Sequence, residues 1–359
     1  MNVNESGPDA SPDERGDSAA KPRAAEHRAT DHSAAGRRHE WRYAFLRAYH
    51  GFMLHRGIDS AATLAFFAAL AIFPAALTVV SALALGQGED QAAETVLDLA
   101  REVLQEDTVE ALKEPLTQLF SVGSPGLALA IGIALSVWSM SSYATAFGRA
   151  ANSVFEIQEG RRFVKFRGLM LVLSAFLLAA FAAVAVLLLT TTNVATAIGE
   201  AFGFGEPWVA IWSYGRWPVL GGILTLIIAV LYYYTPNIRH ERMRWVSTGA
   251  VFAIVTWGLA TAGFGFYVST IANYDRVYGW LGGALALLIW LYISNLAVVA
   301  GVEVDAEFTR LRQLRAGVSA ENTVQLPVRD TFRNLVLARR QAADEAAGIA
   351  IRENAAESE

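Results

Sequence analysis

The sequence predicts an all-α integral membrane protein, a bundle of six transmembrane helices with amphipathic helices at the interface and over the outer face. The first observation is that only 18% of the 359 residues are charged, and that these lie in short islands separated by long charge-free tracts. The second is that six of these tracts reach the roughly 20 residues that a helix needs to cross about 30 Å of hydrocarbon. The third is that Lys and Arg are concentrated in alternate islands.

The six predicted spans cover about residues 61–85, 126–148, 168–190, 217–236, 246–270 and 280–302. The third tract is decisive, because no charged residue lies between Arg167 and Glu200. A buried helix of a soluble protein does not need so long an uncharged run. Pro74 interrupts the first span and is expected to kink it. Small residues recur at four-residue spacing, as at Gly258 and Ala262, which allows helices to approach closely.

Basic residues are distributed unevenly between the two sides of the predicted bundle. Within residues 37–315, sixteen Lys and Arg residues lie before the first span, between spans two and three, between spans four and five, and after span six, whereas the alternate loops hold four. Because Lys and Arg accumulate in short cytoplasmic loops, this alternation predicts an even number of spans with both termini in the cytoplasm. We therefore expect a multi-pass protein of the bacterial cytoplasmic (inner) membrane.

The segments outside the spans differ in character. Residues 1–40 are predicted to be a disordered cytoplasmic tail, because they hold almost no large apolar residues, and 321–359 a polar cytoplasmic tail; the membrane domain is 41–320. The acidic segment 89–123 predicts amphipathic helices over the outer mouth, either a cap facing cations or an ordinary solvated face. Residues 152–168 mix bases with aromatic residues, which predicts a short helix among anionic lipid headgroups of the inner face. The nearly uncharged segment 191–215 is expected to lie in the interface or to dip among the helices.

Several kinds of chemistry find no support in the sequence. The chain has no cysteine, which excludes disulfides, thiolate metal sites and a cysteine nucleophile. None of the six histidines forms a metal-ligand pair beside carboxylates, and His50 and His55 are expected to be solvated among cytoplasmic bases. No phosphate-binding or dinucleotide-binding glycine motif is present. We therefore expect no enzyme, no cofactor, no metal site and no nucleic-acid partner.

Polar residues in and beside the spans are the remaining candidates for a functional site. Asn295 lies two or three turns inside the last span, where its amide is expected either to bond a neighbouring helix or to belong to a substrate path. Glu303 ends that span, where its carboxylate is expected to titrate or to form a structural pair with Arg149. Together with Asn152 and Tyr278, these residues are the four candidate functional positions.

Four motifs occur in an order that resembles the YihY/BrkB family of bacterial inner-membrane proteins. GIDSAATLAFFAALAIFP ends at Pro74, ANSVFEIQEGRRFVKFR follows the second span, and YYYTPN, with Pro236, follows the fourth. YDRVYGWLGGALALLIWLYISNLAVVAGVEVDAE carries Tyr274, Gly279 and Gly301. The resemblance covers about residues 41–310, with Val302 and Asp305 departing from the usual Ala and Asn. It implies a role in envelope integrity or transport, and a former label, ribonuclease BN, is regarded as a misassignment.

Two functions from different classes follow from these observations. The leading hypothesis is a transporter or flippase for a lipid or amphipathic envelope substrate, because the bundle has few charges and two basic interfacial segments that suit anionic headgroups. The alternative is a non-transporting scaffold for envelope integrity, which would tolerate substitutions at Asn152, Asn295 and Glu303. A membrane-bound nuclease is disfavoured, because neither a metal cluster nor a dedicated RNA-binding domain is present.

Overall fold

The computed structural model describes residues 38–88, 124–189, 205–239, 247–270 and 280–357, together with the single positions 94, 97, 114 and 196. The chain forms two compact units, Met1–Arg47 and Ala48–Glu359, and the second unit holds all the helices considered below. Residues 38–54 are helical. Most of the predicted N-terminal tail and of the predicted helices in 89–123 lies outside the described residues.

Six helices in the described residues are long and apolar enough to cross a membrane. They are α2 (Gly57–Gln87), α5 (Pro125–Val154), α6 (Phe163–Leu189), α8 (Gly205–Tyr234), α9 (Thr248–Thr270) and α11 (Trp280–Arg315). A seventh helix, α12 (Phe332–Glu357), is polar and has no buried residue. The predicted all-α fold with six apolar helices is therefore confirmed.

The helices extend beyond the predicted spans at several ends. α5 continues to Val154, and α11 continues to Arg315. Hydropathy marks only the part of a helix that matches hydrocarbon, whereas the backbone stays helical as long as its hydrogen bonds are satisfied. α8 begins at Gly205, inside the segment 191–215 that was expected to lie in the interface or to dip among the helices. Pro207 lies in the first turn of α8, where its missing N–H costs no hydrogen bond.

The segment between α5 and α6 is a loop, and the prediction of a short interfacial helix at 152–168 is wrong. α5 ends in a Schellman motif, in which Glu156 N donates to Ser153 O at 3.0 Å and Ile157 N donates to Asn152 O at 2.9 Å. Glu156 adopts the left-handed conformation (φ 54°) that this motif requires. The chain then runs without a helix to the start of α6 at Phe163.

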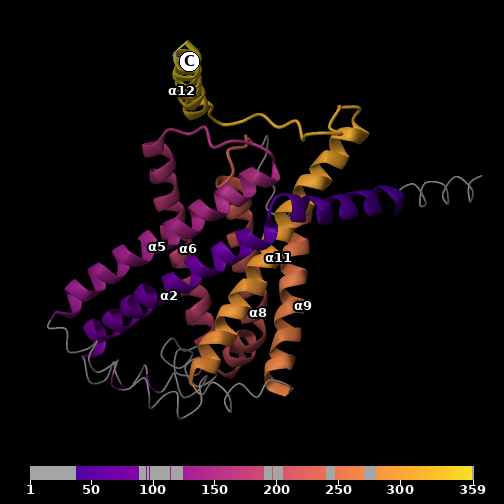
Figure 1. Ribbon diagram of the computed structural model, residues 1–359. Helices are drawn as coiled ribbons and strands as arrows, with labels where there is room; N and C mark the ends of the chain where they lie inside the picture. Colours follow the sequence, from indigo (N-terminus) through magenta and orange to yellow (C-terminus); the bar gives the residue numbers. More distant parts are fainter. Residues whose placement is uncertain are drawn as a thin grey trace, which may run out of the picture. The chain divides into compact units, whose positions relative to one another are not determined.

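Two helix pairs share the most extensive contacts among the described helices, α2 with α5 and α9 with α11 (Figure 1). In the first pair, α2 continues through Pro74, and Thr78 Oγ1 donates to the Pro74 carbonyl at 2.8 Å. The same hydroxyl lies 3.2 Å from Ser136 Oγ of α5. A Cβ atom on Gly132 would lie 3.0 Å from the backbone N of Thr78, so the small residue there allows the close approach.

The pair α9 and α11 crosses at two glycines. A Cβ atom built on Gly249 would lie 2.1 Å from the Gly301 carbonyl oxygen, and one on Gly301 would lie 2.7 Å from the Gly249 carbonyl oxygen. Further along the pair, Trp257 Nε1 donates to Ser294 Oγ at 3.0 Å. Gly301, one of the motif residues, is therefore a packing position at which the two backbones touch.

Large apolar side chains cover the outside of the bundle. Phe73 of α2 is 78% exposed, Val172 of α6 is 70% exposed and Leu259 of α9 is 71% exposed. Each such side chain would cost about 25 cal/mol per Å² of apolar surface left in water. Lipid tails remove that cost, so these faces are the ones that contact the hydrocarbon of a membrane.

Candidate functional site

The site is built where α5, α8 and α11 end and where α2, α6 and α9 begin, which we call the basic end of the bundle. α8 stops at Tyr234, because Pro236 has no N–H with which to continue the helix. Thr235, Pro236 and Asn237 form a buried turn after it. Two carbonyl groups at this end of α8 accept hydrogen bonds from Arg161, at 3.3 Å for Tyr234 O and 2.6 Å for Thr235 O.

Arg161 is held in place by a carboxylate. Its Nη2 lies 2.7 Å from Glu159 Oε2 and its Nε lies 2.7 Å from Glu159 Oε1, a bidentate pair in which Arg161 is 2% exposed. Such paired bonds fix the plane of a guanidinium group as well as its position. The pair therefore aims Arg161 at the end of α8.

Asn152, one of the predicted functional positions, links the end of α5 to the turn after α8. Its Nδ2 donates to Glu159 Oε2 at 3.1 Å, and its Oδ1 accepts from the backbone N of Asn237 at 2.8 Å. The Asn237 side chain in turn donates to Gln158 O at 3.1 Å and to Asp330 O at 2.8 Å. The geometry gives Asn152 a structural role in joining α5, α8 and the segment after α11.

Residues 326–333, which we call the strap, return to this turn after α11. Val328 and Ile238 form an isolated antiparallel bridge, with Arg239 N donating to Pro327 O at 2.8 Å and Arg329 N donating to Asn237 O at 3.0 Å. The Arg329 guanidinium donates to the carbonyls of Ile238 and Tyr233. The division of the chain at residue 320 did not anticipate this return, because nothing in the local pattern marks it.

Gly160 is the point at which the strap lies against the α5–α6 loop. A Cβ atom there would lie 1.9 Å from the Asp330 carbonyl oxygen, so a Gly160→Ala substitution is expected to push the strap away. Hydrogen–deuterium exchange should then accelerate at the amides of Arg329 and Arg333, which donate to Asn237 O and Gly160 O. Gly168→Ala is the matched control, since nothing lies within 4 Å of its Cβ position. Unchanged exchange across 326–333 in Gly160→Ala would contradict this account of the contact.

Glu303 pairs with His55, and not with Arg149 as the sequence suggested. His55 Nδ1 lies 2.8 Å from Glu303 Oε1, and Glu303 is 1% exposed. A Cβ atom on Gly51 would lie 2.8 Å from Glu303 Oε2, so the glycine leaves room for the carboxylate. The expectation that His55 is solvated is wrong, because the ring is part-buried against α11. The partner was missed because it lies 248 positions away in the sequence.

Asn295 joins α11 to α5. Tyr143 OH donates to Asn295 Oδ1 at 2.9 Å, while Asn295 Nδ2 donates to Leu291 O at 2.8 Å. The sequence left two alternatives for the Asn295 amide, a hydrogen bond to a neighbouring helix or a place in a substrate path. The structure contains the hydrogen bond to a neighbouring helix. Three other predicted positions, Tyr274, Tyr278 and Gly279, lie outside the described residues.

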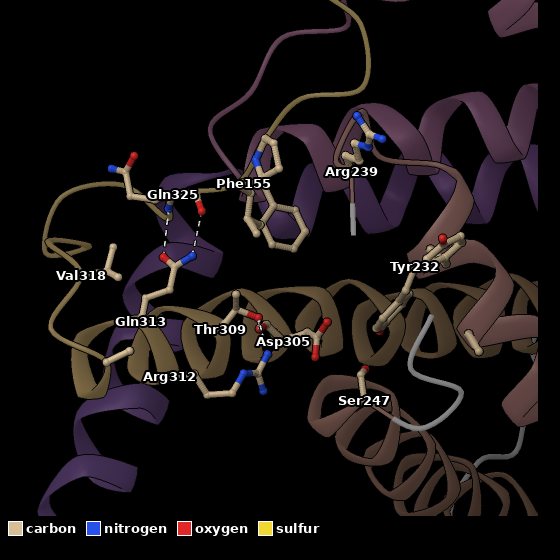
Figure 2. A pocket seen from close by; sticks show the side chains of 15 residues that line it. Phe155, Tyr232, Arg239, Ser247, Asp305, Thr309, Arg312, Gln313, Val318 and Gln325 are labelled. Atoms are coloured by element: carbon tan, nitrogen blue, oxygen red, sulfur yellow. Dashed lines mark hydrogen bonds between the residues drawn. The ribbon is translucent and has the colours of Figure 1, made fainter. Parts of the chain in front are cut away.

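A cavity of about 550 Å³ lies beside this polar network. Figure 2 shows Asp305, Thr309 and Arg312 along α11, with Arg239 and Phe155 on the opposite wall. The cavity is also bordered by Ala229, Tyr232, Tyr233, Ser247, Gln313, Ala316, Val318, Gln325, Leu326 and Pro327. Its wall is thus part aromatic and apolar and part cationic.

Hydrogen bonds fix the chain around the cavity. Gln313 Nε2 donates to Gln325 O at 2.8 Å and Gln325 N donates to Gln313 Oε1 at 3.0 Å, and dashed lines mark both bonds in Figure 2. Deeper in α11, Arg310 Nη1 donates to Ala320 O at 2.7 Å while its Nε lies 3.0 Å from Glu307 Oε2. These bonds hold the segment after α11 against the helix, so that the cavity has a fixed wall on this side.

Polar groups of the cavity come from three elements. Arg312 Nη2 donates to Thr309 Oγ1 at 2.7 Å. Asp305 Oδ1 accepts from Gly249 N at 3.4 Å, at the first turn of α9. Arg239, on the turn after α8, is exposed in the cavity. The sequence did not mark Arg239 or Arg312 as site residues, because their charges served only to orient the predicted spans.

The part of the chain that the structure describes contains no cluster of metal ligands. No group of three or more His, Asp or Glu residues there is arranged to hold a metal ion.

The six apolar helices, joined by polar turns at one end, define a multi-pass α-helical membrane protein. Residues 48–324 match the sequence profile of the family described as virulence factor BrkB, and the chain belongs to this family. The predicted resemblance is therefore confirmed.

Three relatives illustrate the similarity. The chain is 28% identical over 266 residues to YfkH of Bacillus subtilis, a protein named ribonuclease-like, and the match covers 73% of this chain and 94% of YfkH. It is 27% identical over 265 residues to a UPF0761 membrane protein of Alkalilimnicola ehrlichii, covering 70% of this chain and about half, 54%, of that protein. A UPF0761 membrane protein of Tolumonas auensis is 37% identical over 106 residues, 27% of this chain and 35% of that protein. No solved structure matches the chain.

Proposed function

We propose that the protein moves a lipid or another amphipathic envelope substrate across the bacterial inner membrane. The observation that carries the proposal is the cavity at the basic end, where the guanidinium groups of Arg239 and Arg312 share one space with the rings of Phe155 and Tyr233. An amphipathic molecule needs both surfaces, one for its charged head and one for its apolar part.

The bundle beyond the cavity also supports movement of such a molecule. Charged side chains are absent from the middle of the predicted spans, so no fixed charge there would oppose passage of apolar chains. On the buried side of α5, Ser136, Ser139 and Ser141 offer hydroxyl groups in succession. We take the basic end as the cytoplasmic one, because within residues 37–315 sixteen Lys and Arg residues belong to the segments on this side, against four in the alternate loops.

A vesicle assay tests the proposal. The purified chain is reconstituted into vesicles of phosphatidylethanolamine and phosphatidylglycerol with a trace of fluorescent phosphatidylglycerol, and dithionite quenches the outer leaflet. Exchange of the fluorescent lipid between leaflets is expected to be at least several-fold faster than in protein-free vesicles. Ala316→Trp should abolish the gain, because Ala316 is exposed and lines the cavity, which the larger side chain would fill without disturbing the core.

The control is Ala338→Trp, at an exposed position of α12, which should exchange lipid as fast as the unaltered chain. Exchange no faster than in protein-free vesicles, for phosphatidylglycerol and for other envelope lipids, would contradict the proposal. That result would favour the alternative of a non-transporting scaffold.

A further inference from the structure

Among the described residues that line the cavities at the end of α8, positively charged side chains outnumber negatively charged ones. A second cavity, of about 370 Å³, is lined by Tyr233, Tyr234, Arg239 and Arg329, so that Tyr233 and Arg239 border both cavities. Counting the described residues that line the two cavities, three arginines face the single carboxylate of Asp305. That carboxylate accepts a hydrogen bond from Gly249 N, in the first turn of α9.

Two further contacts among the described residues bear on this charge. Arg161, behind the second cavity, is neutralised by its bidentate pair with Glu159. The Arg329 guanidinium donates hydrogen bonds to the carbonyls of Ile238 and Tyr233, and these neutral groups do not cancel its charge. Burial is the main cause that lowers the pKa of Arg329 from its ordinary value, and the positive charge of Arg161 lowers this pKa further. An anion beside these groups would therefore be attracted, and a cation would be repelled.

We propose that the two cavities form a binding site for a phosphate-bearing group with net negative charge, held between Arg239 and Arg312 with Arg329 adding its charge. Planar guanidinium groups suit phosphate, because they donate paired hydrogen bonds to its oxygen atoms. The rings of Tyr233 and Phe155 and the side chain of Leu326 would contact the part of the molecule next to the phosphate. This inference rests on the proposed function and names the chemistry of its substrate, which is a phospholipid headgroup or a soluble phosphate ester.

The site has the features that make specific recognition feasible. Its two cationic walls belong to separate elements, Arg239 to the turn after α8 and Arg312 to α11, so a molecule inside the cavity can contact both. The strap fixes the position of Arg239 through the bond from its backbone N to Pro327 O, at 2.8 Å. An arginine anchored in this way loses less freedom on binding than one on a mobile loop.

Calorimetric titration of the full chain in a non-ionic detergent tests the inference. The probes are dihexanoyl phosphatidylglycerol below its critical micelle concentration, glycerol 3-phosphate, inorganic phosphate and dihexanoyl phosphatidylcholine. The anionic lipid is expected to bind saturably, and Arg239→Gln and Arg312→Gln should each weaken that binding about tenfold, the loss that follows from removing one charge-assisted contact. Arg340→Gln, at an exposed position of α12, removes the same charge and should leave the affinity unchanged.

The comparison of probes identifies the source of the phosphate. Tighter binding of phosphatidylglycerol than of glycerol 3-phosphate identifies a lipid headgroup, and equal binding identifies a soluble ester; both support the inference when the two arginine variants weaken it. Three results would overturn the inference. They are no binding of any phosphate probe, equal affinity for phosphatidylcholine and phosphatidylglycerol, and an affinity that Arg239→Gln and Arg312→Gln leave unchanged.

Failure of the inference and failure of the proposed function give different results. Saturable, arginine-dependent binding without lipid exchange in vesicles would keep the site and remove the transport activity. Rapid lipid exchange that does not depend on headgroup charge or on Arg239 would keep the transport activity and remove the site.

Discussion

Gly249→Ala is expected to destabilise the bundle by about 1–3 kcal/mol, the range typical of overpacking a tight contact. The added Cβ atom would lie 2.1 Å from the Gly301 carbonyl oxygen and 2.9 Å from the backbone N of Asp305, and backbone atoms of α11 cannot move aside as a side-chain end can. A larger residue, as in Gly249→Leu, should prevent correct packing of α9 on α11 altogether.

The measurement is the midpoint temperature of thermal unfolding of the detergent-solubilised chain. Samples are heated to a series of temperatures, and size-exclusion chromatography then gives the fraction that is still folded. Gly258→Ala is the matched control, because it lies on the same helix and nothing is within 4 Å of its Cβ position. The control should be neutral or slightly stabilising, since alanine favours helix more than glycine does. Equal midpoints for Gly249→Ala and Gly258→Ala would show that the helices are not in contact at this crossing.

Replacing His55 by leucine is expected to cost about 3–5 kcal/mol, the usual penalty for leaving a buried charge without its partner. Glu303 is 1% exposed, and its one side-chain hydrogen bond among the described residues is to His55 Nδ1. The unfolding midpoint in detergent at pH 6 measures the loss. His50→Leu is the control, because His50 lies five residues earlier, in the helical segment 38–54, and is exposed. A loss of equal size in both variants would show that the pair with Glu303 contributes nothing.

The same pair makes stability depend on pH. The hydrogen bond to Glu303 raises the pKa of His55 above its ordinary value, against the opposing effect of burial and with help from the charges of Glu303, Glu156 and Glu307. Because the folded pKa is higher than the unfolded one, about 6.5, this stabilisation is complete below pH 6.5 and is lost as the pH rises through the folded pKa. The unfolding midpoint should therefore fall from pH 6.5 upward. The fall should be smaller in Glu303→Gln, and parallel curves for the two proteins would rule out this origin.

The membrane fold could be predicted from the sequence, because it depends on long uncharged tracts and on the placement of Arg and Lys. The polar contacts at the basic end could not. The pair His55–Glu303, the bond between Asn152 and Asn237, and the contact of Gly160 with Asp330 join positions far apart in the chain. Such contacts follow from how helices pack, and no local spacing of residue types announces them.

The error at residues 152–168 has a local cause. The mixture of bases with aromatic residues favoured a helix there, whereas Glu156 takes the left-handed conformation that ends α5, a conformation usually left to glycine. Similarly, Arg239 and Arg312 were counted only as orientation signals. Their common cavity exists because the strap and the turn after α8 meet beside α11, an arrangement that depends on residues 326–333.

The strap also bears on how the chain assembles as it is made. Residues 326–333 leave the ribosome only after α11 has been synthesised, yet they supply Asp330 O to the Asn237 side chain and the Arg329 guanidinium to the Tyr233 carbonyl, in the last turn of α8. Until that moment these buried groups must keep water or other temporary partners. The junction between α5 and α8 is therefore completed late in biogenesis, and a chain that stops short of residue 326 would enter the membrane with this junction still open.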